Sequence, residues 1–396
     1  MLSETPHVVQ ISFFVDPQRR EPARLLQDWP TLADVAEAAQ RGGVRVSVVQ
    51  ACSYTERLTC NGVDYHFFAA DPAARTVAST KGLDRLIHSL EADVFHVHGL
   101  GFPADVGALA NIAPRTPILL QDHADGLPRI WRRRAWRRAF ALASGVAFCA
   151  RQQSEPWTAA GLIGGGTEIY EIAESSSRFK PGEQAEARAR TPLTGDPCLL
   201  WVGHLNANKD PLTVLDGVSE AVRELPGLQL WCCFGSAPLR AQMTARIERD
   251  PRLAGRVHLL GAVPHAEIEL FMRAADFFVQ GSHHEGSGYS LLEALACGLP
   301  PVVTDIPSFR SLTGNGAVGR LWPCGDARAL SAALLSIASQ PRAPLRAEVR
   351  AHFDRSLSFD ALGRTLAETY QRLRDQKPGV VRTDGLRPTG ARPTPI

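Results

Sequence analysis

Short apolar runs rich in β-branched residues recur along the chain and predict buried strands of parallel sheets. Helical patterns separate these runs in both halves of the sequence. Because strands and helices alternate in each half, the pattern predicts an α/β fold with two doubly wound units. The predicted strands are Val8–Val15, Val44–Gln50, Asp93–Val97, Pro117–Leu120 and Gly145–Cys149 in the first half, and Cys198–Val202, Leu228–Phe234, Val257–Leu260, Asp276–Val279 and Pro301–Thr304 in the second.

The clearest helical pattern covers Thr31–Gln40. Thr31 and Asp34 are residue types that cap a helix N-terminus, and Gly42 followed by Gly43 is a typical helix end. We therefore expect a capped amphipathic helix directly before the second predicted strand. Its apolar face comprises Leu32, Val35, Ala36 and Ala39.

Two polar stretches divide the chain. Residues 175–196 have few apolar side chains and separate the two α/β halves, whereas residues 377–396 are rich in proline, glycine and arginine. This tail cannot bury enough apolar surface to offset the entropy of ordering, so we expect it to be disordered. The predicted parts are an N-terminal domain over 1–190, a C-terminal domain over 191–356, a C-terminal helix over 357–376 that is a candidate to pack back on the N-terminal domain, and the tail.

Composition narrows the class of protein only slightly. The 396 residues are 44% hydrophobic and 21% charged, and the formal net charge of +2 gives no global field that selects nucleic acid. Residues 1–10 lack the pattern of a signal peptide, and no run reaches the ~18–20 apolar residues of a membrane span. The 8 scattered cysteines favour buried reduced thiols over disulfides. We expect a cytoplasmic protein.

Candidate chemistry concentrates in residues 281–305. A predicted strand ends just before this segment, a glycine-containing loop follows, and a helix is predicted from Ser290 to Gly298. Ligands of open α/β sheets bind outside the carboxyl ends of strands, where this loop lies. Gly286 and Gly288 allow close approach of the backbone. The free N–H groups and the dipole at the helix start then form an anion site that suits a diphosphate.

Two carboxylates bracket this loop, and the pattern alone leaves two interpretations for each. Glu285 precedes the turn and either points into a cleft or is a solvated loop carboxylate. Glu293 either accepts hydrogen bonds from paired hydroxyls, such as those of a ribose, or closes a capping box with Ser290 that needs no ligand. The two roles of Glu293 are compatible with each other.

The segment resembles the donor signature of retaining glycosyltransferases with the GT-B fold, notably glycosyltransferase family 4. Glu285 and Glu293 stand in that family's E-x7-E arrangement, and the residues around them follow the signature nearly position by position. The resemblance covers roughly residues 93–322. It implies two Rossmann-like domains that face each other across a cleft. It also implies donor contacts from Gly286, Ser287, Gly288, Tyr289, Ser290 and Glu293, with Glu285 beside the reacting sugar.

The turn after the strand Cys198–Val202 carries further donor contacts in the resemblance. Gly203 belongs to this turn, and Lys209 matches a family lysine that neutralises the donor diphosphate. Without the resemblance, Lys209 is better interpreted as an exposed lysine at a helix start. The family's arginine is His204 here, and a neutral imidazole donates one hydrogen bond but carries no fixed charge. We therefore expect Lys209 to supply more of the stabilisation, as a catalytic residue.

Histidines at strand ends indicate a second wall of the cleft. His96 and His98 end one predicted strand, and His123 follows the next. A lone histidine is more often structural, but three at adjacent strand ends make a structural role and a site role about equally good interpretations. His123 best matches the family histidine that faces the donor sugar, and we count it as catalytic with Glu285. The family's Gly-Gly loop after the first strand is replaced by residues 16–30, which leaves the acceptor unspecified. The weak acceptor candidates in this loop are Asp16, Arg19 and Arg20.

One concentrated basic run, Arg129–Phe140, is predicted to form a helix. It carries Ile130, Phe140 and two tryptophans among its arginines. The run is a candidate contact with an anionic acceptor or with the inner face of a membrane. The alternative is a solvated surface helix with snorkelling arginines.

Together these features predict a retaining glycosyltransferase that moves a sugar from a nucleotide-diphosphate donor to a hydroxyl of a glycan, a lipid-linked acceptor or a small molecule. The sequence contains no Asp-x-Asp pair, so we expect neither a cofactor nor an essential metal. Two alternatives stay open: a nucleotide-sugar epimerase or hydrolase on the same scaffold, and a catalytically silent binding subunit. A Rossmann dehydrogenase is disfavoured, because no G-x-G-x-x-G follows an early strand.

Overall fold

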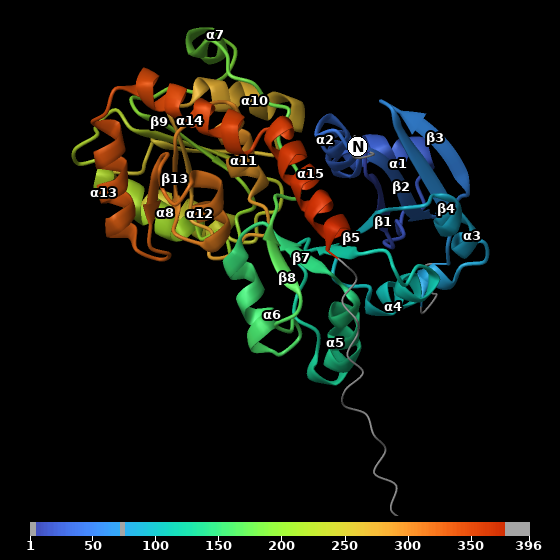
Figure 1. Ribbon diagram of the computed structural model, residues 1–396. Coiled ribbons are helices and arrows are strands. Elements are labelled where there is room, and N and C mark those ends of the chain that lie inside the picture. Colours follow the sequence, from blue (N-terminus) through green and yellow to red (C-terminus); the bar gives the residue numbers. More distant parts are fainter. Residues whose placement is uncertain (1–4, 72–75, 377–396) are drawn as a thin grey trace, which may run out of the picture.

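Two mostly parallel sheets, each covered by helices, form the two halves of the computed structural model (Figure 1). It describes residues 5–71 and 76–376, so the tail over 377–396 that we expect to be disordered lies outside the described residues. The first half contains β1 His7–Ser12, α1 Pro22–Asp28, α2 Pro30–Arg41, β2 Arg45–Cys52, β3 Glu56–Cys60, β4 Val63–Ala69, α3 Leu83–Ser89, β5 Val94–His98, α4 Pro103–Ile112, β6 Ile118–Gln121, α5 Arg133–Leu142, β7 Gly145–Phe148, α6 Glu155–Ala159 and β8 Glu168–Glu171.

The second half follows a connecting segment and has the same alternation. Its elements are α7 Gln184–Ala189, β9 Cys198–Val202, α8 Pro211–Ala221, β10 Gln229–Cys233, α9 Arg240–Arg249, β11 Val257–Gly261, α10 His265–Ala274, β12 Phe277–Gln280, α11 Tyr289–Ala296, β13 Pro301–Thr304, α12 Pro307–Thr313, β14 Arg320–Trp322, α13 Ala327–Ala338, α14 Arg342–Ser356 and α15 Phe359–Asp375. The strand orders are β3-β4-β2-β1-β5-β6-β7-β8 and β11-β10-β9-β12-β13-β14. Both sheets are doubly wound, as predicted.

All ten predicted strands are present, with ends within three residues of the prediction. The pattern missed β3, β4, β8 and the three-residue β14. β3 is almost wholly exposed, β4 alternates buried with half-buried positions, and β8 has glutamates at both ends. β3 and β4 form an antiparallel hairpin at the sheet edge. Such strands lack the continuous apolar run that marks a buried parallel strand.

The helix expected over 31–40 is α2, but the predicted cap is wrong. Trp29 occupies the N-cap position without a side-chain hydrogen bond, and Pro30 opens the helix. Asp34 is buried and accepts a 3.1 Å hydrogen bond from the Arg178 guanidinium instead. The helix does end as predicted, with Gly43 at φ +90°.

The packing of two helices shows to which domain the segments near the predicted boundaries belong. Helix α7 packs against α10 of the second domain, although it precedes the predicted boundary at 190/191. The helix predicted over 357–376 is α15, which returns to pack against α2 (Figure 1). Glycine allows the close approach of these two helices: a Cβ atom on Gly363 would lie 2.2 Å from the Ala38 carbonyl oxygen. The C-terminal helix thereby fixes the first domain against the second.

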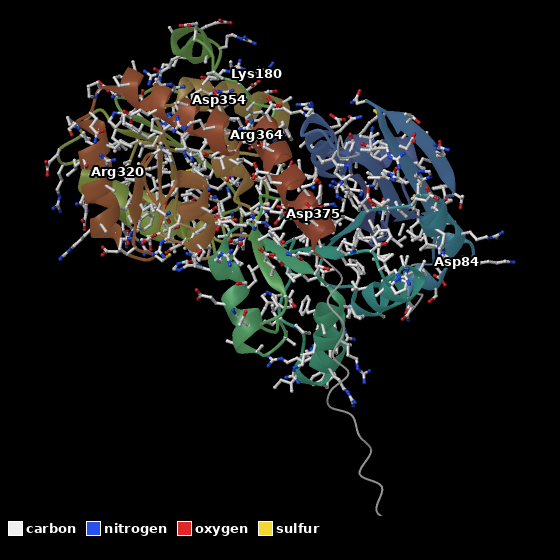
Figure 2. The ribbon with its side chains drawn as sticks, in the orientation of Figure 1. Asp84, Lys180, Arg320, Asp354, Arg364 and Asp375 are labelled. Carbon is white, nitrogen blue, oxygen red and sulfur yellow. The ribbon has the colours of Figure 1, made fainter. Side chains whose placement is uncertain are left out.

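Each sheet buries an apolar cluster on both of its faces. Successive residues of β1, such as Val8 and Val9, belong to clusters on opposite faces of the sheet. Charged side chains such as Asp84 and Arg320 project outward (Figure 2). All eight cysteines are free thiols, but Cys60 and Cys324 are exposed rather than buried. Among the described residues, no helix has the length and apolarity to cross a bilayer.

Candidate active site

A cavity of about 870 Å³ lies between the carboxyl ends of the two sheets. On the second domain, its lining comes from the turns after β9, β10 and β11 and from the loop over 281–288, which we call the signature loop. On the first domain, the lining includes Ala124, after β6, and the start of α2. The cavity contains every predicted donor contact. These are Gly203, His204, Lys209, Gly286, Ser287, Gly288, Tyr289, Ser290 and Glu293, together with Glu285.

Helix α11 opens onto this cavity without a side-chain cap. Gly288 is its N-cap at φ 66°, a left-handed conformation that favours glycine, and the helix begins at Tyr289. The capping box considered for Ser290 and Glu293 is therefore wrong, because Ser290 lies inside the first turn. The hydroxyl of Ser290 lies 3.4 Å from the Gln280 amide oxygen instead. The first N–H groups of α11 thus remain available to an anion.

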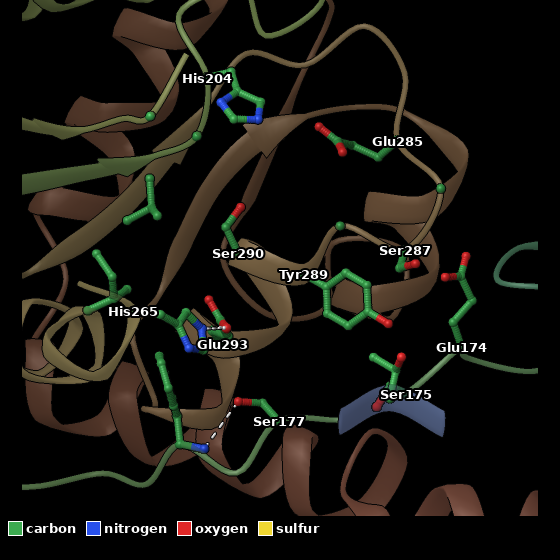
Figure 3. A pocket seen from close by; sticks show the side chains of 18 of the residues that line it. Glu174, Ser175, Ser177, His204, His265, Glu285, Ser287, Tyr289, Ser290 and Glu293 are labelled. Atoms are coloured by element: carbon green, nitrogen blue, oxygen red, sulfur yellow. Dashed lines mark hydrogen bonds and ion pairs between the residues drawn. The ribbon is translucent and has the colours of Figure 1, made fainter. Parts of the chain in front are cut away.

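The carboxylate of Glu293 is hydrogen-bonded to a histidine that also lines the cavity. His265 Nε2 lies 2.6 Å from Glu293 Oε1 (Figure 3). Burial raises the pKa of Glu293, and the hydrogen bond from His265 partly offsets this. Within the described chain, no hydrogen bond occupies the second carboxylate oxygen. Glu293 therefore presents a free acceptor to a ligand in the cavity.

Lys209 and Glu285 form an ion pair inside the cavity. Their side chains are only 16% and 13% exposed, so the pair is largely removed from water. Lys209 comes from the turn after β9 and Glu285 from the loop after β12, and these strands are neighbours in the sheet. The sheet order thus brings the predicted ammonium and carboxylate together. Lys209 is not an exposed lysine at a helix start.

His204 stands at the cavity rim with a defined tautomer (Figure 3). The backbone N–H of Ser236 donates to His204 Nδ1 at 3.1 Å. Since Nδ1 accepts, the neutral ring carries its proton on Nε2. His204 can therefore donate one hydrogen bond to a ligand, although it lacks the fixed charge of the family's arginine.

His123 does not line the cavity, contrary to its predicted position facing the sugar. Its Nδ1 lies 3.2 Å from Glu174 Oε2, and its Nε2 lies 3.1 Å from His98 Nδ1. Burial lowers the pKa of His123, but the hydrogen bond and charge of Glu174 outweigh it and leave the pKa raised. The cavity is lined by Glu174 instead. His123 thus reaches the cavity through its carboxylate partner.

His96 is a structural histidine. It is fully buried, with Tyr370 Oη at 2.7 Å and Gln121 Oε1 at 2.9 Å. Burial lowers the pKa of His96 to about 3, so the ring is neutral at physiological pH. Its partner Tyr370 comes from α15, which ties the C-terminal helix to the centre of the first sheet.

The first domain also grips the signature loop directly. Gln153 Nε2 donates to the carbonyl oxygens of Glu285 and Gly286 at 2.9 and 3.0 Å. A Cβ atom on Gly286 would lie 2.7 Å from the Ala124 Cβ atom, so only glycine fits at this crossing. The sequence contains no pattern that indicates these contacts. It also missed other lining residues, namely Pro30, Thr31, Asp34, Glu174, Ser175, Ser176, Ser177, Arg178 and Phe179.

The weak acceptor candidates of the first loop do not reach this cavity. Asp16 is buried and accepts hydrogen bonds from Arg20, whose guanidinium lies 4.7 Å from the centroid of the Trp29 ring. Neither side chain lines the cavity, and Arg19 does not line it either. The ion pair of Asp16 and Arg20 stabilises the loop rather than presenting charge to a ligand.

Both domains match family models. Residues 183–353 match "Glycosyl transferases group 1", and residues 31–159 match "Glycosyltransferase Family 4". The chain belongs to the group 1 glycosyltransferases of family 4. The resemblance noted in the sequence is therefore confirmed for the family.

Relatives of this family 4 chain include the D-inositol 3-phosphate glycosyltransferase of Thermobispora bispora, 30% identical over 202 residues, which are 48% of this chain and 47% of the relative. The GDP-mannose:cellobiosyl-diphosphopolyprenol alpha-mannosyltransferase of Xanthomonas campestris is 25% identical over 236 residues, 58% of this chain and 60% of the relative. The chain spans about half the length of the curated relatives it matches. The crystal structure of Anabaena HepE in complex with UDP aligns with a TM-score of 0.64 and 18% identity, over 92% of this chain and 100% of that one. This likeness confirms the predicted GT-B fold.

Proposed function

We propose that the chain transfers a sugar from a nucleotide-diphosphate donor to an acceptor hydroxyl, with retention of the anomeric configuration. The observation that carries this proposal is the convergence of Lys209, Glu285 and the uncapped start of α11 in one cavity between the domains. Membership of a glycosyltransferase family supports the reaction type.

The donor's leaving group fits the second-domain side of the cavity. The diphosphate would bind the first N–H groups of α11, with the Lys209 ammonium and His204 Nε2–H beside it. Donors fixed before the reaction stabilise the charge that develops on the departing diphosphate without reorganisation. Glu293 would accept hydrogen bonds from the ribose hydroxyls. The base would contact Val263, which follows β11 and lines the cavity.

The sugar fits where the two domains meet. Glu285 and Glu174 approach this region from opposite domains, and Glu174 is paired with His123 (Figure 3). A glycosyl transition state carries positive charge on the sugar ring, which nearby carboxylates stabilise. Since His123 does not line the cavity, we assign it the role of orienting Glu174.

We further propose that no divalent metal is required. Lys209 and the dipole of α11 supply the positive charge that a metal would otherwise bring to the diphosphate. Turnover in EDTA equal to turnover with added Mn²⁺ or Mg²⁺ is the expected result. Complete loss of transfer on chelation, with recovery on adding Mn²⁺, would refute this part of the proposal.

A thermal-shift panel of UDP-, GDP- and ADP-sugars tests the donor site. One nucleotide should raise the melting temperature, because a ligand at a hundredfold excess over its dissociation constant adds ~2.7 kcal/mol to stability. Product analysis with donor alone then separates the alternatives: an epimerase makes a new nucleotide sugar, and a hydrolase releases free sugar. If no nucleotide sugar shifts melting, the silent-subunit alternative replaces this proposal.

We also propose a peripheral contact of the Arg129–Phe140 segment with the inner face of an anionic membrane. The buried Phe140 anchors this segment, whereas Ile130 and Trp131 are 76% and 73% exposed beside the arginines. Exposed aromatic and aliphatic side chains next to cations are typical of interfacial helices. Co-sedimentation with phosphatidylglycerol vesicles, but not with phosphatidylcholine vesicles, is expected. Equal binding to the two kinds of vesicle would contradict an electrostatic contribution to this membrane contact.

A further inference from the structure

A second cavity, of about 780 Å³, lies in the first domain. Its walls are the loop after β1, the turn after β5 with the start of α4, and the segment formed by the 3-10 turn Ile130–Arg132 and α5. We call it the α4–α5 groove. The two helices pack side by side over one face of the first sheet (Figure 1). The proposed donor site uses none of the groove's lining residues.

Aromatic side chains line the α4–α5 groove. Phe13 and Phe102 line it, with ring centroids 6.1 Å apart. Phe14 and Trp131 also line it, although they are 44% and 73% exposed. Trp136 lines it too, and its buried indole N–H has no hydrogen-bond partner among the described residues. Several large exposed apolar side chains around one hollow mark a binding surface rather than a random surface feature.

The lining of the groove is also cationic. Arg132, Arg134 and Arg138 line it, and no acidic partner is found for them among residues 5–71 and 76–376. The groove's carboxylate, Asp105, is buried and accepts a 2.7 Å hydrogen bond from the Ala78 N–H. Burial raises the pKa of Asp105, and hydrogen bonds from the backbone N–H groups of Ala78 and Val77 partly offset this. One guanidinium can donate two hydrogen bonds to a pair of phosphate oxygens, so these arginines suit a phosphate or diphosphate ligand.

The α4–α5 groove lies next to the sugar end of the donor cavity. Leu100 N–H, at the end of β5, donates to Asp125 Oδ2 at 2.7 Å, and Gly101 beside it lines the groove. Ala124, the neighbour of Asp125, lines the donor cavity. A single short turn therefore separates the two spaces. A molecule seated in the groove would present its far end to the reacting sugar.

We propose that the α4–α5 groove binds the acceptor, and that the acceptor is an amphiphile in which an apolar chain adjoins a phosphate or diphosphate. The assignment rests on the proposed transferase function, because it identifies the second substrate of the same reaction. A purely apolar ligand would leave the three guanidiniums unpaired, and a free phosphate would leave the aromatic side chains exposed to water. An amphiphilic phosphate would pair with the arginines through its oxygens and cover the aromatic side chains with its apolar chain.

Geranyl diphosphate is a soluble probe for this site. We would titrate it into the full chain with saturating nucleoside diphosphate, so that the donor cavity is filled, and follow tryptophan fluorescence, since Trp131 and Trp136 line the groove. A saturable signal is expected. Geraniol, which lacks the charge, and inorganic diphosphate, which lacks the chain, should each bind at least about tenfold more weakly.

Two double variants on the same helix provide a matched comparison. R134Q/R138Q removes two groove arginines and should weaken geranyl diphosphate about tenfold or more. R133Q/R137Q removes the same charge, but these arginines donate to the carbonyls of Pro128 and Gly161, so binding should be unchanged. Unchanged melting temperatures would show that both variants fold.

Three results would overturn the groove assignment: no saturable signal, equal binding of inorganic diphosphate, or equal weakening in both double variants. The first excludes a site, the second indicates a free-phosphate site, and the third indicates general electrostatic attraction. The thermal shift by nucleotide sugars, measured on the same preparations, separates this proposal from the previous one. If nucleotide sugars bind while geranyl diphosphate does not, the groove assignment alone fails.

Discussion

The ion pair of Lys209 and Glu285 has a consequence for donor binding that depends on which partner is removed. Both side chains line the donor cavity and are largely shielded from water. When a diphosphate binds at the start of α11, the Lys209 ammonium has to exchange its carboxylate partner for phosphate oxygens. The carboxylate of Glu285 therefore competes with the ligand for the same cation. Lys209→Met and Glu285→Gln should change nucleotide affinity in opposite directions.

The size of each effect follows from the strength of charge-assisted hydrogen bonds. A hydrogen bond to a charged group contributes about 1.5–3 kcal/mol, so Lys209→Met should weaken nucleoside diphosphate binding about 10- to 150-fold. Glu285→Gln removes the competitor but leaves the side-chain volume, so affinity should improve by about 0.5–1.5 kcal/mol, which is about 2- to 12-fold. Turnover should nevertheless fall in Glu285→Gln, because the carboxylate beside the sugar is lost.

Isothermal titration calorimetry with the nucleotide selected by the thermal-shift panel measures both effects. Lys180→Met is a matched control, since Lys180 is exposed, lies outside the donor cavity and carries the same charge (Figure 2). Its affinity should equal that of the unsubstituted chain. If Lys209→Met and Glu285→Gln weakened binding by the same factor, the pair would be a structural support for the loop, and the exchange argument would be wrong.

Three further substitutions test the remaining parts of the site. Glu293→Gln should weaken nucleotide binding about tenfold in the same titration, because a ribose contact loses its charge; unchanged affinity would remove the ribose assignment. The raised pKa of His123 stabilises the fold below pH ~6.5, and this stability is lost as pH rises through the folded pKa. Glu174→Gln should lower that pKa in an NMR titration, and an unmoved pKa would refute the pairing. Gly286→Ala should reduce kcat/KM, since its Cβ would lie 2.7 Å from the Ala124 Cβ; Ala124→Gly in the same chain should restore it, and failure of the rescue would contradict the steric account.

The fold was predictable from sequence wherever one residue pattern had one structural meaning. Buried parallel strands such as Cys198–Val202 need an unbroken apolar run on both faces, so their positions were predicted within three residues. The exposed strand Glu56–Cys60 forms because Val63–Ala69 pairs with it, and no local pattern records that pairing. The predicted cap of α2 was wrong for a similar reason, because Asp34 accepts a hydrogen bond from the distant Arg178 instead.

The donor side of the site was predictable because the signature loop, its glycines and its carboxylates are consecutive in sequence. The choice between a ligand contact and a capping box was not predictable, because it depends on whether Gly288 or Ser290 is the N-cap residue of the helix. The left-handed conformation of Gly288 decides this. The orientation of His123 depends on Glu174, which lies 51 residues later, so residue type alone could not reveal it.

The contacts that sequence missed are mostly those between the domains, and they explain how two separate folds make one site. Gln153 lies 132 residues before Glu285, yet its amide holds the carbonyls that precede the diphosphate-binding amides. Because peptide groups are planar, fixing these carbonyls also restricts the direction of the N–H groups of Gly286 and Ser287. The first domain therefore helps to hold the signature loop that leads into α11, without lending it a charge. If the donor binds as proposed, its binding would be coupled to the contact between the domains through this loop, because Gly286 meets Ala124 of the first domain.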